Sequence, residues 1–96
     1  MNEYQELAMR TKGPSLNESD ALVLSALGLC GEAGEFADRL KKELFHGHIH
    51  AFAEATEELG DILWYVTRAC EALGTDLEWV AEKNIRKLQQ RYPPGS

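Results

Sequence analysis

The feature that most constrains the fold is an apolar stripe with helical spacing between residues 20 and 45. Its members recur every three or four positions, the spacing that places side chains on one face of an α-helix. They are Leu22, Ala26, Leu29, Ala33, Phe36, Leu40 and Leu44. No strand-like alternation of apolar and polar residues stands out elsewhere, so the chain is expected to be all-α.

Similar patterns predict four helices in total. Their expected ranges are residues 2–11, 19–45, 52–73 and 77–91. All three prolines lie outside these ranges, as expected for a residue that interrupts helices. Ser19 or Asp20 can cap the second helix, and Asp76 can cap the fourth. Gly74 is placed to end the third helix.

The length of 96 residues suits one domain, residues 1–96, with a thin core. Val23, Leu27 and Cys30 lie well away from the apolar stripe, so apolar residues wrap widely around the second helix. One neighbouring helix cannot cover both sides. We therefore expect a helical bundle completed by oligomerisation, with a homodimer as the minimal unit or a dimer of dimers.

Gly28, Gly31 and Gly34 fall inside the second predicted helix. Glycine in a helix interior costs about 0.8–1 kcal/mol relative to alanine, so a cluster of three requires an explanation. Two explanations are open at this point. Another helix or a ligand approaches closely, or the helix is locally broken.

The formal net charge is -6, from 16 acidic and 10 basic residues. A nucleic-acid or membrane-surface binder would carry a basic face, so neither kind of partner is expected. No apolar run is long enough to span a membrane and the first residues are polar, so the expected location is the cytoplasm. Cys30 and Cys70 are expected to be reduced core residues rather than a disulfide.

Two pairs of carboxylates carry the clearest chemical signal. Glu32 and Glu35 lie three residues apart in the second predicted helix, which makes them neighbours on its surface. Glu58 and Asp61 form the same arrangement in the third. A short turn midway between the pairs would let antiparallel packing bring them to the same height. A divalent cation would relieve the repulsion between converging carboxylates; the alternative is solvated acids paired with nearby basic residues.

The fourth predicted helix adds Asn84, Lys87 and Arg91, which follow one another along the edge of its apolar face. Cations in such a row could hold phosphate oxygens, Arg through a bidentate fork. A solvated flank is the alternative for a row of this kind.

Residues 28–38 read GLCGEAGEFAD, and residues 57–65 read EELGDILWY. These segments resemble the two signatures of the MazG-like nucleotide pyrophosphohydrolases, which belong to the all-α NTP pyrophosphatase superfamily. The family pattern of two Glu-x-x-Glu/Asp pairs fits at the four acids described above. Residues 83–93 also resemble the closing segment of the family, and residues 4–11 resemble the opening of its short members.

The resemblance implies an all-α fold whose helices bundle across a dimer. It implies that Glu32, Glu35, Glu58 and Asp61 are the catalytic residues and bind Mg²⁺, with Mn²⁺ as a possible substitute. The implied reaction is hydrolysis of a (deoxy)nucleoside triphosphate to the monophosphate and pyrophosphate. Some members carry an additional Glu directly before the first acid, where this chain has Gly31.

Within this interpretation Asn84, Lys87 and Arg91 would bind the phosphates of the substrate. Tyr65 lies on the same helix face as Asp61 and would either touch the nucleoside or pack in the core. His46, His48 and His50 occupy the second predicted turn, as a polar loop, as residues near the substrate or as a metal site. Their role is left open.

Two other functions are compatible with the sequence. A phosphoribosyl-ATP pyrophosphohydrolase would use similar acids on a different nucleotide. A catalytically silent helical module would use the same apolar faces to bind a protein partner. Pyrophosphate release, measured with and without Mg²⁺, separates these possibilities.

Overall fold

The computed structural model describes residues 2–47 and 51–95, and these residues form four helices and no strand. The helices are α1 (Asn2–Met9), α2 (Glu18–His46), α3 (Ala51–Ala72) and α4 (Leu77–Arg91). The predicted all-α class is confirmed, and the helix bounds differ from the expected ranges by at most two residues. None of the described helices is long and apolar enough to cross a membrane.

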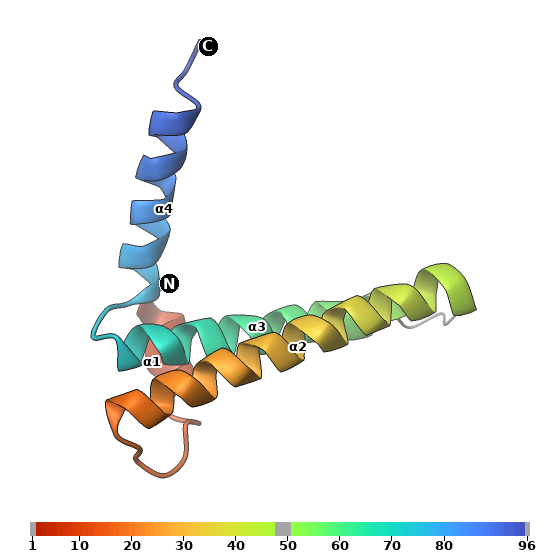
Figure 1. The fold of residues 1–96 in the computed structure, drawn as a ribbon, viewed down its shortest axis with the longest axis horizontal. Coiled ribbons are helices and arrows are strands. Elements are labelled where there is room, and N and C mark those ends of the chain that lie inside the picture. The colour runs from red at the N-terminus through yellow and green to blue at the C-terminus, as the bar shows by residue number, and fades with distance from the viewer. Residues whose placement is uncertain (1, 48–50, 96) are drawn as a thin grey trace.

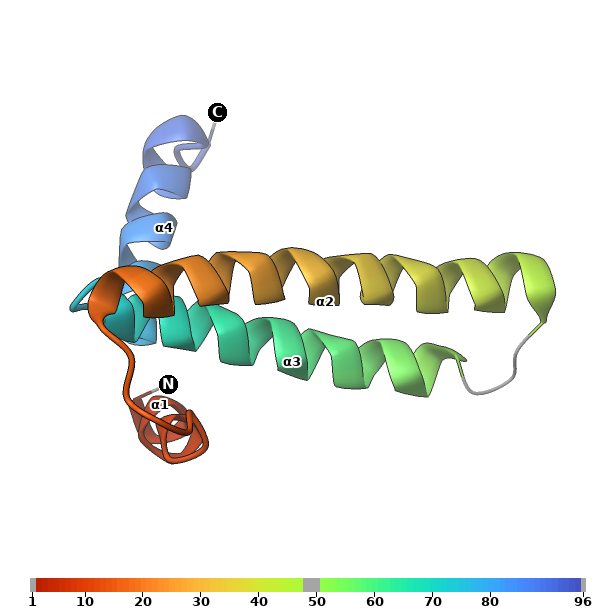
Figure 2. The same ribbon diagram turned by 60° about the horizontal axis from the view of Figure 1, so that its bottom comes forward.

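The long helices α2 and α3 form an antiparallel hairpin, α1 packs against α3, and α4 stands away from the hairpin (Figures 1 and 2). Ser25 and Thr67 are almost fully buried, and each hydroxyl bonds a carbonyl one turn earlier in its own helix. Because these side chains are small and internally satisfied, they are suited to a closely packed helix pair.

Polar contacts attach α1 to the rest of the chain. The Gln5 side chain accepts a 2.9 Å hydrogen bond from the Leu77 N–H and donates to the Thr75 carbonyl at 3.5 Å. The Trp64 indole N–H donates to the Ala8 carbonyl at 3.2 Å. The first helix is therefore tied both to α3 and to the start of α4.

The helix ends confirm two predicted signals and correct a third. Asp76 caps α4 by accepting from the Trp79 N–H, and Gly74 ends α3 with a left-handed φ of 73°. The predicted caps of α2, Ser19 and Asp20, are wrong. Asn17 has the extended backbone of a cap and accepts from the Asp20 N–H at 2.8 Å. Ser19 and Asp20 therefore lie inside the first turn.

The glycines of α2 do not break the helix, which is continuous from Glu18 to His46. Gly28 is explained by close approach, because a Cβ at this position would collide with the Tyr65 ring on α3. Gly31 and Gly34 have nothing within 4 Å of such an added Cβ. Among the described residues, close approach therefore accounts for only the first of the three.

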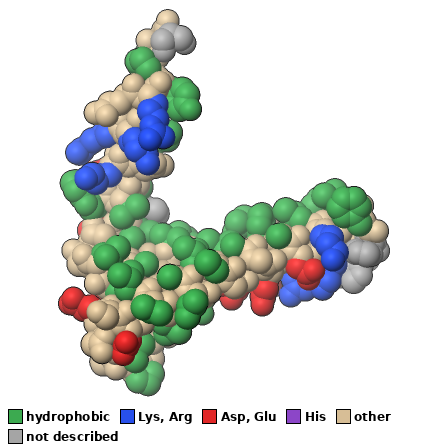
Figure 3. Space-filling view, viewed as in Figure 1, with side chains coloured by type: hydrophobic (Ala, Val, Ile, Leu, Met, Phe, Trp, Pro, Cys, Tyr) green, Lys and Arg blue, Asp and Glu red, His purple; other side chains and the backbone are tan. Residues whose placement is uncertain are grey.

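The core of one chain is small. Its buried apolar side chains are Ala8, Ala21, Ala55, Cys70, Ala72 and Leu77. Large apolar residues such as Leu27 (67%) and Val23 (58%) are exposed instead, and Figure 3 shows hydrophobic side chains along the hairpin and around its junction with α4. Both cysteines are free as predicted, but Cys30 is exposed on α2, so its predicted core position is wrong within one chain.

The exposed surface area and the radius of gyration both show that one chain is less compact than a typical protein of its size. The chain exposes 7000 Å², whereas a compact folded protein of this mass exposes about 5,500 Å². The radius of gyration is 16.2 Å, against about 12.5 Å for a compact domain of this length. The excess comes from an uncovered hairpin and a projecting α4.

Candidate metal centre

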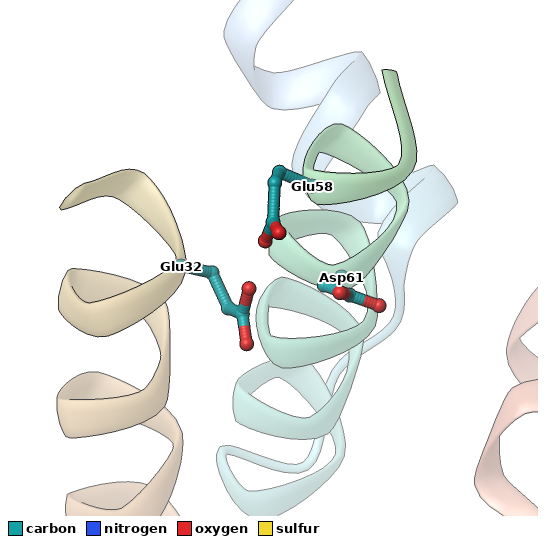
Figure 4. Close-up of side chains that lie close together, drawn as sticks. All are labelled: Glu32, Glu58 and Asp61. Atoms are coloured by element: carbon teal, nitrogen blue, oxygen red, sulfur yellow. The ribbon is translucent and has the colours of Figure 1, made fainter. Parts of the chain in front are cut away.

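Three of the four predicted acids meet halfway along the helical hairpin. One carboxylate oxygen from each of Glu32, Glu58 and Asp61 lies within 4.8 Å of the others. Glu32 projects from α2 toward the two side chains of α3 (Figure 4). The antiparallel pairing of α2 with α3 thus places residues distant in sequence at the same height.

The electrostatics of this acidic cluster are unfavourable without a cation. Glu58 is only 7% exposed, and neither its Oε2 nor the buried Oε2 of Glu32 receives a hydrogen bond from the described residues. The pKa of Glu58 is raised, first by the adjacent Glu32 carboxyl group, then by burial, and then by the charges of Glu32 and Asp61. Unpaired carboxylate oxygens around one point are the donor set that Mg²⁺ prefers, so these residues fit a divalent cation.

Glu35, the fourth predicted acid, lies at the margin of the cluster. Its side chain is exposed, and it is not among the three acids that converge within 4.8 Å. It is nevertheless close enough to Glu58 to act on the pKa of that residue in the lowering direction. Its predicted role as a catalytic residue and metal ligand stays a prediction.

Basic residues pair with the cluster only at one edge. Arg39 Nε lies 3.9 Å from Glu58 Oε1, and Arg39 Nη1 lies 2.9 Å from Glu54 Oε2. Lys42 pairs with Asp38 at 3.2 Å instead. Across residues 2–47 and 51–95 no ion pair reaches Glu32, Glu35 or Asp61. Pairing with basic side chains therefore does not account for the cluster.

A cleft of about 360 Å³ adjoins the cluster, and its lining joins acids to aromatic rings. The lining residues are Thr11, Glu32, Asp61, Trp64 and Tyr65. The Trp64 indole N–H donates to Thr11 Oγ1 at 2.8 Å, which fixes the segment after α1 as one wall. Tyr65 lines this cleft and also packs on Gly28, and its predicted contact with the nucleoside stays a prediction.

Thr11 is a site residue that the sequence interpretation missed. It belongs to the opening segment that resembles the family, but helical spacing gives no indication that this segment folds back onto α3. Trp64 is half-buried and forms part of the cleft wall.

The structure does not bring the predicted phosphate-binding row to the acids within one chain. Asn84, Lys87 and Arg91 are exposed on α4, which projects away from the hairpin (Figure 1). Of the histidines, His48 and His50 lie outside the described residues, and His46 is the last residue of α2.

Comparison with known proteins adds two findings. The family model for the MazG nucleotide pyrophosphohydrolase domain matches residues 23–96. The chain is 36% identical over 80 residues to the "Gene 37 protein" of Mycobacterium phage L5, an alignment that covers 79% of this chain and 70% of the phage protein. No solved structure shows a significant match.

Proposed function

This chain belongs to the MazG nucleotide pyrophosphohydrolase family, and we propose that it hydrolyses a (deoxy)nucleoside triphosphate to the monophosphate and pyrophosphate with the help of Mg²⁺. The observation that carries the proposal is the convergence of Glu32 and Asp61 on the buried Glu58. Glu58 is almost fully buried beside Glu32 and Asp61, and two of the carboxylate oxygens receive no hydrogen bond from the described part of the chain. Burial of such a group is costly unless a cation compensates it.

In this proposal Glu32, Glu58 and Asp61 hold the cation, and Glu35 completes the set from the margin. When bound, Mg²⁺ supplies neutralisation of phosphate charge and makes a nearby water more acidic; Mn²⁺ is a plausible substitute. Glu35 is exposed and acts on the pKa of Glu58, and in this proposal it would accept a proton from the attacking water. The cleft walled by Thr11, Trp64 and Tyr65 would receive the nucleoside end of the substrate.

We further propose that the active unit is a homodimer, the minimal step toward any dimer of dimers. One chain exposes roughly 1,500 Å² more than a compact protein of its size, which exceeds the roughly 800 Å² that each partner buries in a standard interface. The exposed Val23 and Leu27 on α2 and Ile85 and Leu88 on α4 offer the apolar area.

The same arrangement would complete the site. The α4 helix carries Asn84, Lys87 and Arg91 away from the acids of its own chain, so these side chains would reach phosphate oxygens on a second copy. Basic side chains on α4 and carboxylates on the hairpin have the complementary charges that such a contact requires.

The deciding experiment measures pyrophosphate release from ribo- and deoxyribonucleoside triphosphates and from phosphoribosyl-ATP, with and without Mg²⁺. Mg²⁺-dependent release from a triphosphate supports the proposal. Release from phosphoribosyl-ATP alone would favour the related pyrophosphohydrolase, and no release from any substrate would favour the silent helical module. The free thiols of Cys30 and Cys70 suit a reducing compartment, so we propose the cytoplasm as the location.

A further inference from the structure

Arg39 occupies a position between two carboxylates on the facing helix. Its Nη1 lies 2.9 Å from Glu54 Oε2, and its Nε lies 3.9 Å from Glu58 Oε1. Glu54 and Glu58 are one turn apart on α3, so a single guanidinium on α2 spans both. Glu58 therefore has a cation on one side and the acids Glu32 and Asp61 on the other.

The contact between Arg39 and Glu58 is incomplete. The Nε of Arg39 is buried and donates no hydrogen bond to any described residue, and 3.9 Å is too long for one. A buried donor without a partner is costly, and so is the buried Glu58 Oε2 that receives no hydrogen bond. A shift of roughly 1 Å would turn the Nε–Oε1 contact into a charge-assisted hydrogen bond.

We infer that Arg39 is a positioning residue for the metal centre. It is anchored by Glu54 and approaches Glu58 on the side of Oε1, which limits the orientations that the Glu58 carboxylate can adopt beside Glu32 and Asp61. Carboxylates that bind metals depend on such outer partners for their orientation, and loss of the partner typically weakens metal affinity 10- to 100-fold. The inference rests on the proposed metal centre and adds to it a residue outside the acidic cluster.

Positioning and charge repulsion predict opposite changes in metal affinity when Arg39 is removed. A cation near a metal centre repels the incoming ion, so removal of the Arg39 charge alone would strengthen metal binding. Arg39 is 30% exposed, and solvent screens this repulsion. The positioning role therefore predicts weaker metal binding on removal of Arg39, whereas a purely electrostatic role predicts tighter binding.

The experiment measures the Kd for Mn²⁺ alone by calorimetry, without nucleotide, on the full chain. Arg39→Met should raise the Kd by about 10- to 100-fold. Arg39→Lys keeps the charge but cannot span both carboxylates, so its Kd should also rise. Lys42→Met is the matched control, because it removes the same charge from the same helix at a residue that pairs with Asp38; its Kd should stay at the wild-type value or fall slightly.

Glu54→Gln gives a second route that leaves Arg39 in place. It removes the anchor of the guanidinium and should weaken Mn²⁺ binding, although less than Arg39→Met does. Glu54→Gln also removes a negative charge, so if Arg39→Met does not fold, as judged by circular dichroism, Arg39→Lys decides the question because it keeps the charge of residue 39. The inference is overturned if the folded Arg39 variants bind Mn²⁺ as tightly as wild type or more tightly. A wild-type protein that binds no Mn²⁺ would overturn the proposed metal centre as well, so the two failures are distinct.

Discussion

The aromatic ring of Tyr65 on α3 occupies the space that a Cβ on Gly28 of α2 would need. This contact lies beside the acidic cluster, because Tyr65 also lines the cleft that contains Glu32 and Asp61. The close approach of the two helices at the site is thus tied to the absence of one side chain.

Gly28→Ala should therefore destabilise the protein. Overpacking costs about 1–3 kcal/mol, which outweighs the roughly 0.8–1 kcal/mol gained from helix propensity. Gly31→Ala is the matched control, since nothing lies within 4 Å of its added Cβ, and it should be neutral or stabilising. Urea unfolding at a fixed protein concentration compares the two; equal stability of both variants would contradict the contact.

Loss of a single acid should stop turnover without unfolding the chain. Asp61→Asn and Glu35→Gln should each lower pyrophosphate release to background, while circular dichroism retains the wild-type helicity. Glu57→Gln serves as the control, because this exposed neighbour of Glu58 is not one of the converging acids. A near-wild-type rate in Asp61→Asn or Glu35→Gln would refute the assignment of that residue.

Glu58→Gln should make the metal-free protein more stable at neutral pH. The pKa of Glu58 is raised in the folded state, so the folded chain holds this proton more tightly than the unfolded chain does. Its contribution to stability is full below the ordinary pKa of 4.5 and is lost as pH rises through the raised value.

Thermal melts of the metal-free wild type should show this loss between acidic and neutral pH. Gln mimics the protonated acid, so the variant should lack that part of the pH dependence and should gain little from added Mg²⁺. If the melting temperatures of both proteins depend on pH in the same way, the neighbouring acids do not raise the pKa of Glu58.

Removal of the cations of α4 should impair substrate use. Lys87→Met and Arg91→Met should each raise KM, lower kcat, or both, by about 10- to 150-fold, the value of a lost charge-assisted hydrogen bond. Arg86→Met is the control, because Arg86 on the same helix pairs with Glu82 and lies over the Trp79 ring. Kinetic silence of both Lys87→Met and Arg91→Met would make the row a solvated flank.

A mixture of two impaired variants, Glu58→Gln and Arg91→Met, tests whether these cations act on another copy. Glu58→Gln lacks a functional acidic cluster, and Arg91→Met lacks the cation. A mixed dimer joins the intact acids of one chain to the intact α4 of the other, so activity should return to about a quarter of wild type on random pairing. A mixture that stays inactive would place the cation and the acids in the same chain.

The exposed apolar face of α2 should hold the dimer together. Leu27 is 67% exposed in one chain, and Leu27→Glu would place a charge in the interface. Sedimentation at micromolar concentration should find wild-type dimers and Leu27→Glu monomers, with activity lost in the monomer. A stable, active wild-type monomer would exclude the interface.

The helices could be predicted from the sequence because apolar spacing, caps and stop signals are local. Asp76 and Gly74 act as expected, and the error at Ser19 and Asp20 arose because Asn17 presents an equally good cap. The meeting of Glu32 with Glu58 and Asp61 was also predictable, because a short turn fixes the pairing of the two helices.

The sequence did not predict contacts that depend on how a connecting segment orients the next helix. The fold-back of Thr11 onto Trp64 depends on the path of the segment between α1 and α2, which has no periodicity. Apolar spacing identifies which face of a helix is apolar, but it does not determine the angle between two helices. The projection of α4 away from the hairpin could therefore not be predicted. Arg39 was recognisable only as a nearby cation until its two partners on α3 were located.

The projecting α4 has a consequence for how activity responds to protein abundance. Residues 78–91 are all exposed, and an isolated helix of this length is marginal in water. In the proposed dimer, α4 would become ordered as it docks on a second copy, and Asn84, Lys87 and Arg91, which we propose bind phosphate, would become ordered in the same step. Dilution would then lower activity because α4 unfolds, not because substrate dissociates. Faster amide hydrogen exchange along α4 on dilution would reveal this unfolding.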